Sequence, residues 1–147
     1  MTAPLLVAAD IDVAALLSEL RAWVEIETPS RDAARVNALV DRVEARARAG
    51  DFVVQRTPGT MGYGDILSVT AKGAAKEGRL LILAHLDTVH PVGTLEHDLP
   101  WHAEEGRIYG PGIYDMKSGA LMALYALELS TGRAEGLPVE ILFVPDE

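Results

Sequence analysis

The apolar run from Leu80 to Ala84 constrains the fold of this chain more than any other stretch. Five consecutive apolar residues are typical of a strand that is buried on both faces of a sheet. His85 and Asp87 follow the run directly, and side chains two residues apart on a strand point the same way. In open α/β sheets, ligands bind at this end of the strands. The run therefore predicts a buried strand that presents an imidazole and a carboxylate together at a binding edge.

Helical and strand patterns alternate along the rest of the chain. An apolar stripe at helical spacing runs from Asp10 to Glu27, and Thr28-Pro29-Ser30 ends it, because the residue before a proline disfavours the helical conformation. Ser30 is then expected to cap a second helix. Further segments are predicted as a strand pair at 52–57 and 66–71, a short extended piece at 107–109, a helix at 117–130 ended by Gly132, and a strand at 137–144. This alternation predicts an α/β layer architecture.

Composition excludes several classes of protein. The chain has 147 residues, the size of one domain, and its hydrophobic content of 49% is that of a globular protein. A net charge of −9 argues against nucleic acid or an anionic membrane as a partner. The absence of cysteine excludes a thiol nucleophile and thiolate zinc sites. No stretch has the length of a membrane span or the pattern of a secretory signal, so the cytoplasm is the predicted location.

Acidic side chains follow two further segments. Asp115 comes after a Gly-Pro-Gly turn, and Asp146 and Glu147 follow the last predicted strand. Imidazole and carboxylate groups are the ligands that hydrolytic divalent metals take when thiolates are absent. His85 offers a nitrogen, and the two oxygens of Asp115 can bridge two ions. Asp87 can accept the second N–H of His85, and Glu147 can take a proton from a water molecule. These residues predict a metal site.

Each of these residues also has a simpler interpretation. His85 can be a hydrogen-bonded histidine at a strand end, Asp115 can cap the following helix, and Glu147 can be a surface residue. A non-catalytic α/β interaction domain, with a structural metal or none, is therefore the alternative hypothesis. A structural site would be closed by protein ligands, whereas a catalytic site leaves a position open. The remaining histidines, His90, His97 and His102, are expected to have loop or surface roles.

Three motifs in order resemble those of the M20 family of metallopeptidases. They are H-L-D-T-V at 85–89, G-P-G-I-Y-D-M-K-S-G at 110–119 and V-P-D-E at 144–147. The P-V-G-T-L that follows the first motif is most similar to the glutamate carboxypeptidase branch. The resemblance implies a three-layer, zinc-exopeptidase-like α/β fold, with a mixed sheet and helices on both faces, incomplete at the C-terminus. Residues 1–147 would form the N-terminal part of the catalytic domain, without the remainder of that domain or the dimerisation domain.

The resemblance also implies a role for each motif residue. His85 would bind one of two divalent ions, expected to be Zn²⁺ with Co²⁺ or Mn²⁺ as alternatives. Asp87 would orient His85, and Asp115 would bridge the ions and precede a cis peptide bond to Met116. Glu147 would be the general base. Asp87 and Glu147 are thus the predicted catalytic residues, and His85 and Asp115 the predicted metal ligands.

The activity that the resemblance implies is hydrolysis of a peptide or N-acyl amide bond next to a free carboxylate. The substrate would be a small peptide or an N-acyl amino acid, and the full-length protein would be a homodimer. A deacylase of the acetylornithine deacetylase or desuccinylase type is the alternative within the family. Because a catalytic zinc normally has three protein ligands, the 147-residue chain alone is expected to bind metal weakly and to have no turnover.

Overall fold

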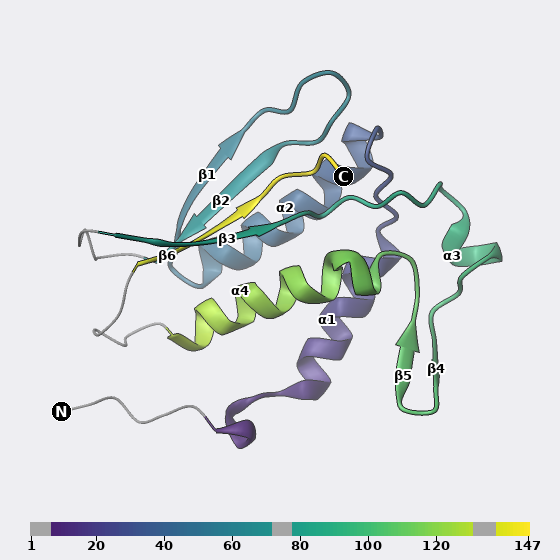
Figure 1. Ribbon diagram of the computed structural model, residues 1–147, viewed down its shortest axis with the longest axis horizontal. Coiled ribbons are helices and arrows are strands. Elements are labelled where there is room, and N and C mark those ends of the chain that lie inside the picture. The colour runs from purple at the N-terminus through teal and green to yellow at the C-terminus, as the bar shows by residue number, and fades with distance from the viewer. Residues whose placement is uncertain (1–6, 72–77, 131–137) are drawn as a thin grey trace.

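The protein is built on a four-stranded mixed sheet, seen here in a computed structural model that describes residues 7–71, 78–130 and 138–147 (Figure 1). Its strands lie in the order β1-β2-β6-β3. The hairpin of β1 and β2 is antiparallel, β2 and β6 are antiparallel, and β6 and β3 are parallel. The strands are β1 (Val53–Thr57), β2 (Ile66–Thr70), β3 (Leu80–Ala84) and β6 (Val139–Phe143). The predicted α/β class and the strand pair are confirmed.

Three long helices accompany this sheet, together with shorter elements. The long helices are α1 (Val13–Glu25), α2 (Ala33–Ala49) and α4 (Ser118–Ser130). The shorter elements are η1 (Ala8–Asp10), α3 (Thr94–His97), η2 (Ile113–Lys117) and a two-stranded sheet of β4 (His102–Glu104) and β5 (Arg107–Tyr109). The sequence predicted β5 but neither α3 nor β4, and Gly132 lies outside the described residues. None of the described helices combines the length and apolar character that crossing a membrane requires.

The helices pack on one face of the sheet. Helix α2 contacts β1 and β2, and α4 contacts β3 and β6. Both cover the face that carries Leu67, Val69, Ile141 and Phe143, all of which are fully buried. Helix α4 is apolar almost all round because α1 packs against it as well (Figure 1). The core of the described residues therefore lies between the sheet and these three helices.

Strand β3 differs from the expectation of a strand buried on both faces. It forms an edge of the described sheet, and its three leucines, Leu80, Leu81 and Leu83, are 51%, 50% and 62% exposed. An apolar run shows that a strand is hydrophobic, but it does not show how many layers cover the strand. In the described residues one face of β3 is covered. A helical layer on the second face stays a prediction.

The connection between α1 and α2 also differs from its prediction. Helix α1 ends at Glu25, before the Thr28-Pro29 pair, as expected for a chain that must become extended before a proline. The cap of α2 is Asp32, whose carboxylate accepts a hydrogen bond from the backbone N–H of Arg35 at 3.1 Å. The backbone N–H of Ser30, the predicted cap, instead donates to the carbonyl of Thr88. Ser30 therefore belongs to a contact with the loop after β3.

One pair of substitutions tests the one-sided burial of the sheet. Leu67→Ala should lower the free energy of unfolding by about 2–5 kcal/mol, because the side chain is fully buried in the core. The same change at the exposed Leu83 should cost less than about 0.5 kcal/mol. Urea unfolding of the two variants measures the difference. Equal losses would contradict the packing described here.

Candidate metal centre

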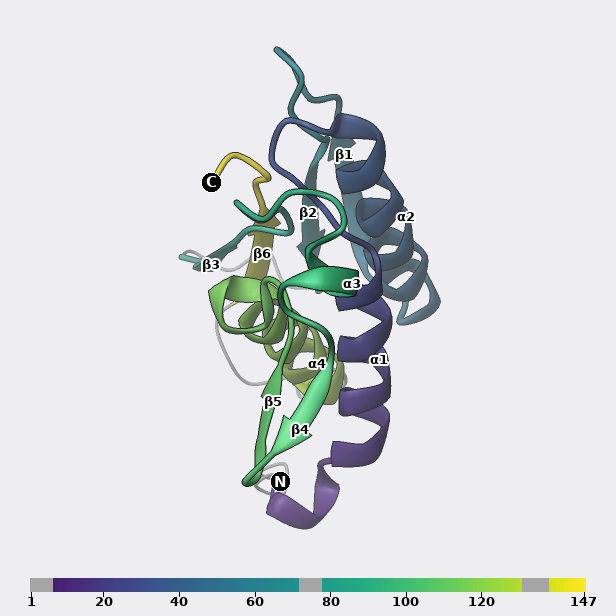
Figure 2. The ribbon, with the colours of Figure 1, turned by 90° about the vertical axis from the view of Figure 1, so that its right-hand side faces the viewer.

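The candidate site lies at the edge of the sheet where β3 and β6 end. Because these two strands are parallel, their C-terminal ends meet at the same edge. His85 and Asp87 follow β3, and Glu147 follows β6. Asp115 comes from η2, the turn that leads into α4. Helix α3 and the β4–β5 hairpin lie at this end of the molecule too (Figure 2).

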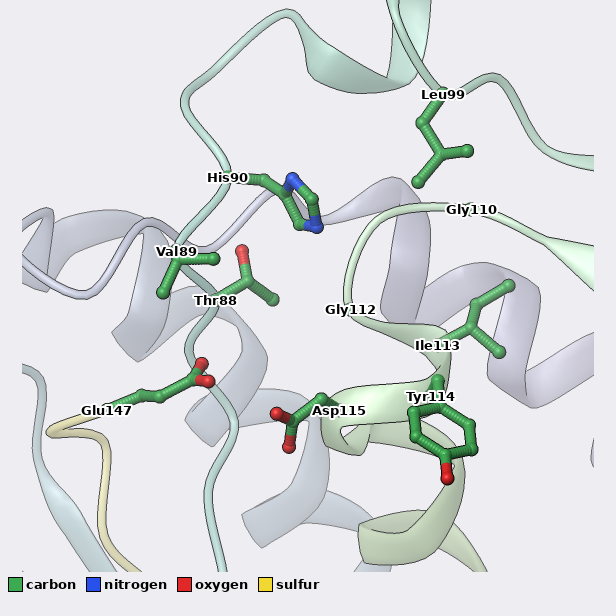
Figure 3. A pocket seen from close by; sticks show the side chains of 10 residues that line it. All are labelled: Thr88, Val89, His90, Leu99, Gly110, Gly112, Ile113, Tyr114, Asp115 and Glu147. Carbon is green, nitrogen blue, oxygen red and sulfur yellow. The ribbon is translucent and has the colours of Figure 1, made fainter.

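The imidazole of His85 is close to two carboxylates. Its Nε2 atom lies 3.1 Å from Oδ1 of Asp115, and its Nδ1 atom lies 3.7 Å from Oε2 of Glu147. One ligand atom from each of the three residues lies within 4.8 Å of the other two. The carboxylates of Asp115 and Glu147 point toward each other across the edge of a pocket (Figure 3). Within the described ranges this is the group of histidine and acidic residues that can hold a metal ion.

Asp87 contacts both His85 and the backbone of Glu147. Its side chain is fully buried, and its Oδ2 atom accepts a hydrogen bond from the backbone N–H of Glu147 at 3.0 Å. The Nδ1 atom of His85 lies 3.1 Å from the main-chain oxygen of Asp87 and 3.5 Å from its Oδ1. An Nδ1–H that donates to this main-chain oxygen leaves the lone pair of Nε2 for a metal. Asp87 thus contacts both His85 and Glu147, and its main-chain oxygen lies nearer to the ring than its carboxylate.

The electrostatics of the cluster suit a cation. Burial raises the pKa of Glu147, and the nearby carboxylates of Asp115 and Asp87 raise it further against the opposing effect of His85. Burial lowers the pKa of His85, but the hydrogen bond with Asp115 and the surrounding negative charge outweigh this effect and raise it. In the described part of the chain, Oδ1 of Asp87 is the buried side-chain oxygen without a hydrogen-bond partner. The imidazole of His85 and the carboxylates of Asp115 and Glu147 therefore form an N/O donor set that fits a divalent ion.

The turn that presents Asp115 depends on a glycine and is followed by a buried lysine. Gly112 has φ of 70°, and a Cβ atom there would lie 2.3 Å from Cγ2 of Thr88, so only glycine lets the turn approach the loop after β3. The Asp115–Met116 peptide bond is cis, as the family resemblance implied. Lys117 is 1% exposed, and burial lowers its pKa to about 8. Sequence reasoning missed Lys117, although its place in the D-M-K-S-G motif is a signal.

A pocket of about 220 Å³ opens beside the cluster (Figure 3). Asp115 and Glu147 form one end, and Leu99, Ile113 and Tyr114 contribute to its walls. His90 lines this pocket but does not belong to the metal-binding group. The other two histidines lie elsewhere: His97 is exposed on α3, and the ring of His102 stacks on Tyr109 with 4.6 Å between their centroids.

The fold and the site define a class of protein: a mixed α/β domain with histidine and carboxylate groups gathered at the ends of parallel strands. The model of one family, peptidase family M20/M25/M40, matches residues 81–147, which include all four predicted site residues. The chain is also 32% identical over 136 residues to carboxypeptidase G2 from Pseudomonas sp. (strain RS-16). The resemblance of this chain to the M20 metallopeptidases is thereby confirmed. The match to carboxypeptidase G2 covers 90% of this chain and 32% of that protein.

Solved structures agree on the fold. The M20 family metallo-carboxypeptidase Sso-CP2 from Sulfolobus solfataricus superimposes with a TM-score of 0.71 at 21% identity, over 93% of this chain and 31% of that one. Human carnosine dipeptidase 1 superimposes with a TM-score of 0.70 at 13% identity, over 88% of this chain and 31% of that one. The chain thus spans about a third of the length of the relatives it matches.

Proposed function

We propose that the protein carrying this chain is a metal-dependent hydrolase that cleaves a peptide or N-acyl amide bond next to a free carboxylate. The observation that carries this proposal is the convergence of His85, Asp115 and Glu147 beside an open pocket. The match of residues 81–147 to a peptidase family supports the reaction class. The similarity to a carboxypeptidase supports a substrate with a free carboxylate. Use of two ions, homodimer formation and a cytoplasmic location are further parts of the proposal.

Each site residue has a separate role in this proposal. Two divalent ions, Zn²⁺ first among the candidates, would polarise the scissile carbonyl and lower the pKa of a water molecule. His85 and Asp115 would hold the ions, and Asp87 would keep His85 and the backbone of Glu147 in place. Glu147 would take a proton from the attacking water and return it to the leaving amine. Its raised pKa favours this use as base and then acid, because proton transfer is most efficient when the pKa approaches the working pH.

Metal removal tests the proposal. The full-length protein would be treated with a chelator and then supplied with Zn²⁺, Co²⁺ or Mn²⁺, and hydrolysis would be measured on dipeptides with a C-terminal glutamate and on N-acetyl amino acids. We expect activity to disappear on metal removal and to return with at least one ion. Faster cleavage of the dipeptides supports a carboxypeptidase, and faster cleavage of the N-acetyl compounds would point to a deacylase. Hydrolysis that persists without metal would contradict the proposal.

A further inference from the structure

Residues 26–30, which follow α1 in the chain between α1 and α2, lie against the loop that carries His85 and Asp87. We call these five residues the connector. The hydroxyl of Thr28 donates to the carbonyl of Leu86 at 2.8 Å, and the carbonyl of Thr28 accepts from the backbone N–H of Thr88 at 2.8 Å. Thr28 and Thr88 are both buried. The connector therefore fixes the backbone on both sides of Asp87.

The same connector is tied to the turn that carries Asp115. The ammonium group of Lys117 donates to the carbonyl of Ile26 at 2.8 Å and to that of Trp23 at 3.1 Å. These carbonyls belong to the end of α1, where the last carbonyls of a helix have no partner within the helix and carry its negative partial charge. Lys117 thus joins the end of α1 to a turn in which Asp115 is only two residues away.

A third contact joins the connector to residues farther along the chain after β3. The carboxylate of Glu27 accepts hydrogen bonds from the backbone N–H groups of Gly93 and Leu95, at 2.8 and 2.9 Å. The connector thus contacts the loop after β3 both near its beginning and near its end. His85 and Asp115 lie 30 positions apart in the chain. The loop that carries His85 and the turn that carries Asp115 nevertheless both form hydrogen bonds with the connector.

We propose that Lys117 is a positioning residue that holds Asp115 at the distance from His85 which metal binding needs. This inference rests on the proposed function. A buried ammonium group is costly to desolvate, and an apolar side chain would fill the same space at lower cost. What Lys117 adds is a directed link between the two loops through the connector. Its loss should therefore loosen the spacing of His85 and Asp115 as well as the end of α1.

The test compares Lys117→Met with Arg46→Met in the full-length protein. Arg46 makes a similar contact in another place: its guanidinium donates two hydrogen bonds of 2.7 Å to Glu128 on α4. Each variant thus removes one cation and two hydrogen bonds. Co²⁺ is the probe, because its visible absorption reports both affinity and ligand geometry. We expect Lys117→Met to weaken Co²⁺ binding by about 10–100-fold and to change the spectrum, as loss of a residue that orients metal ligands does.

Arg46→Met is expected to lower thermal stability while it keeps the wild-type affinity and spectrum. If Lys117→Met does not fold, Thr28→Val decides, since it removes only the hydroxyl that bonds to Leu86. Its matched control is Thr70→Val, at the far end of β2. If folded Lys117→Met keeps the wild-type affinity and spectrum, the inference is overturned and the proposed function stands. The same holds for Thr28→Val if that variant has to be used instead. Failure of the wild-type protein to bind any of Co²⁺, Zn²⁺ and Mn²⁺ would overturn both.

Discussion

Replacing Glu147 with glutamine should reduce turnover of the full-length enzyme by about 10²–10⁴-fold, the range for loss of a general base. The amide has nearly the same size as the carboxylate, and the backbone N–H of Glu147 still donates to Asp87. The amide cannot accept a proton from water at neutral pH. The loss should therefore fall on kcat, with a smaller change in KM. Steady-state kinetics at saturating metal measure both constants.

Asp146→Asn is the matched control for this substitution. Asp146 is exposed and adjacent in the chain, but it does not belong to the group of His85, Asp115 and Glu147. The control should keep turnover within a few-fold of the wild-type value while it removes the same charge. Metal content should be unchanged in the control. If Glu147→Gln keeps most of its turnover, Glu147 is not the base, and the proposed mechanism fails at that step.

Much of the fold could be predicted from the sequence because its patterns are local. The helical stripe of α1, the glycine-rich turn between β1 and β2, and the apolar runs of β3 and β6 can each be recognised within a short stretch of neighbouring residues. Which layers cover a strand depends on distant parts of the chain. The expectation that β3 is buried on both faces was wrong for this reason. Leu83 is equally apolar under one covering layer or two, so the pattern alone could not reveal its exposure.

The residues of the candidate site could also be predicted from the sequence, but their contacts could not. His85 and Asp87 stand at a strand end, and Asp115 and Glu147 stand in motifs whose spacing is recognisable. The contacts between loops could not be predicted. No pattern indicates that Asp87 bonds to the backbone of Glu147, 60 positions away, or that Lys117 reaches α1. These contacts depend on how the elements pack, and a single sequence does not record packing.

Replacing Asp115 with asparagine should have the largest effect on metal binding. The substitution keeps the size of the side chain but removes its charge and leaves a single carbonyl oxygen as a metal donor. A residue that only orients a ligand costs about 10–100-fold in affinity when it is lost, so loss of a ligand charge should exceed about 100-fold. Turnover should fall at least as far as in Glu147→Gln. Isothermal titration with Zn²⁺ measures the affinity, and Asp98→Asn, in the exposed loop after α3, is the control.

Thermal unfolding separates this effect from a general loss of structure. A ligand that binds only the folded state at 100 times its Kd stabilises it by about 2.7 kcal/mol. The wild-type protein, Asp98→Asn and Glu147→Gln should all show such a gain on addition of Zn²⁺, whereas Asp115→Asn should unfold at nearly the same temperature with and without the ion. The two site variants would then fail for different reasons, one without its metal and one without its base. A Zn²⁺-dependent gain in Asp115→Asn equal to that of the wild type would exclude Asp115 as a metal ligand.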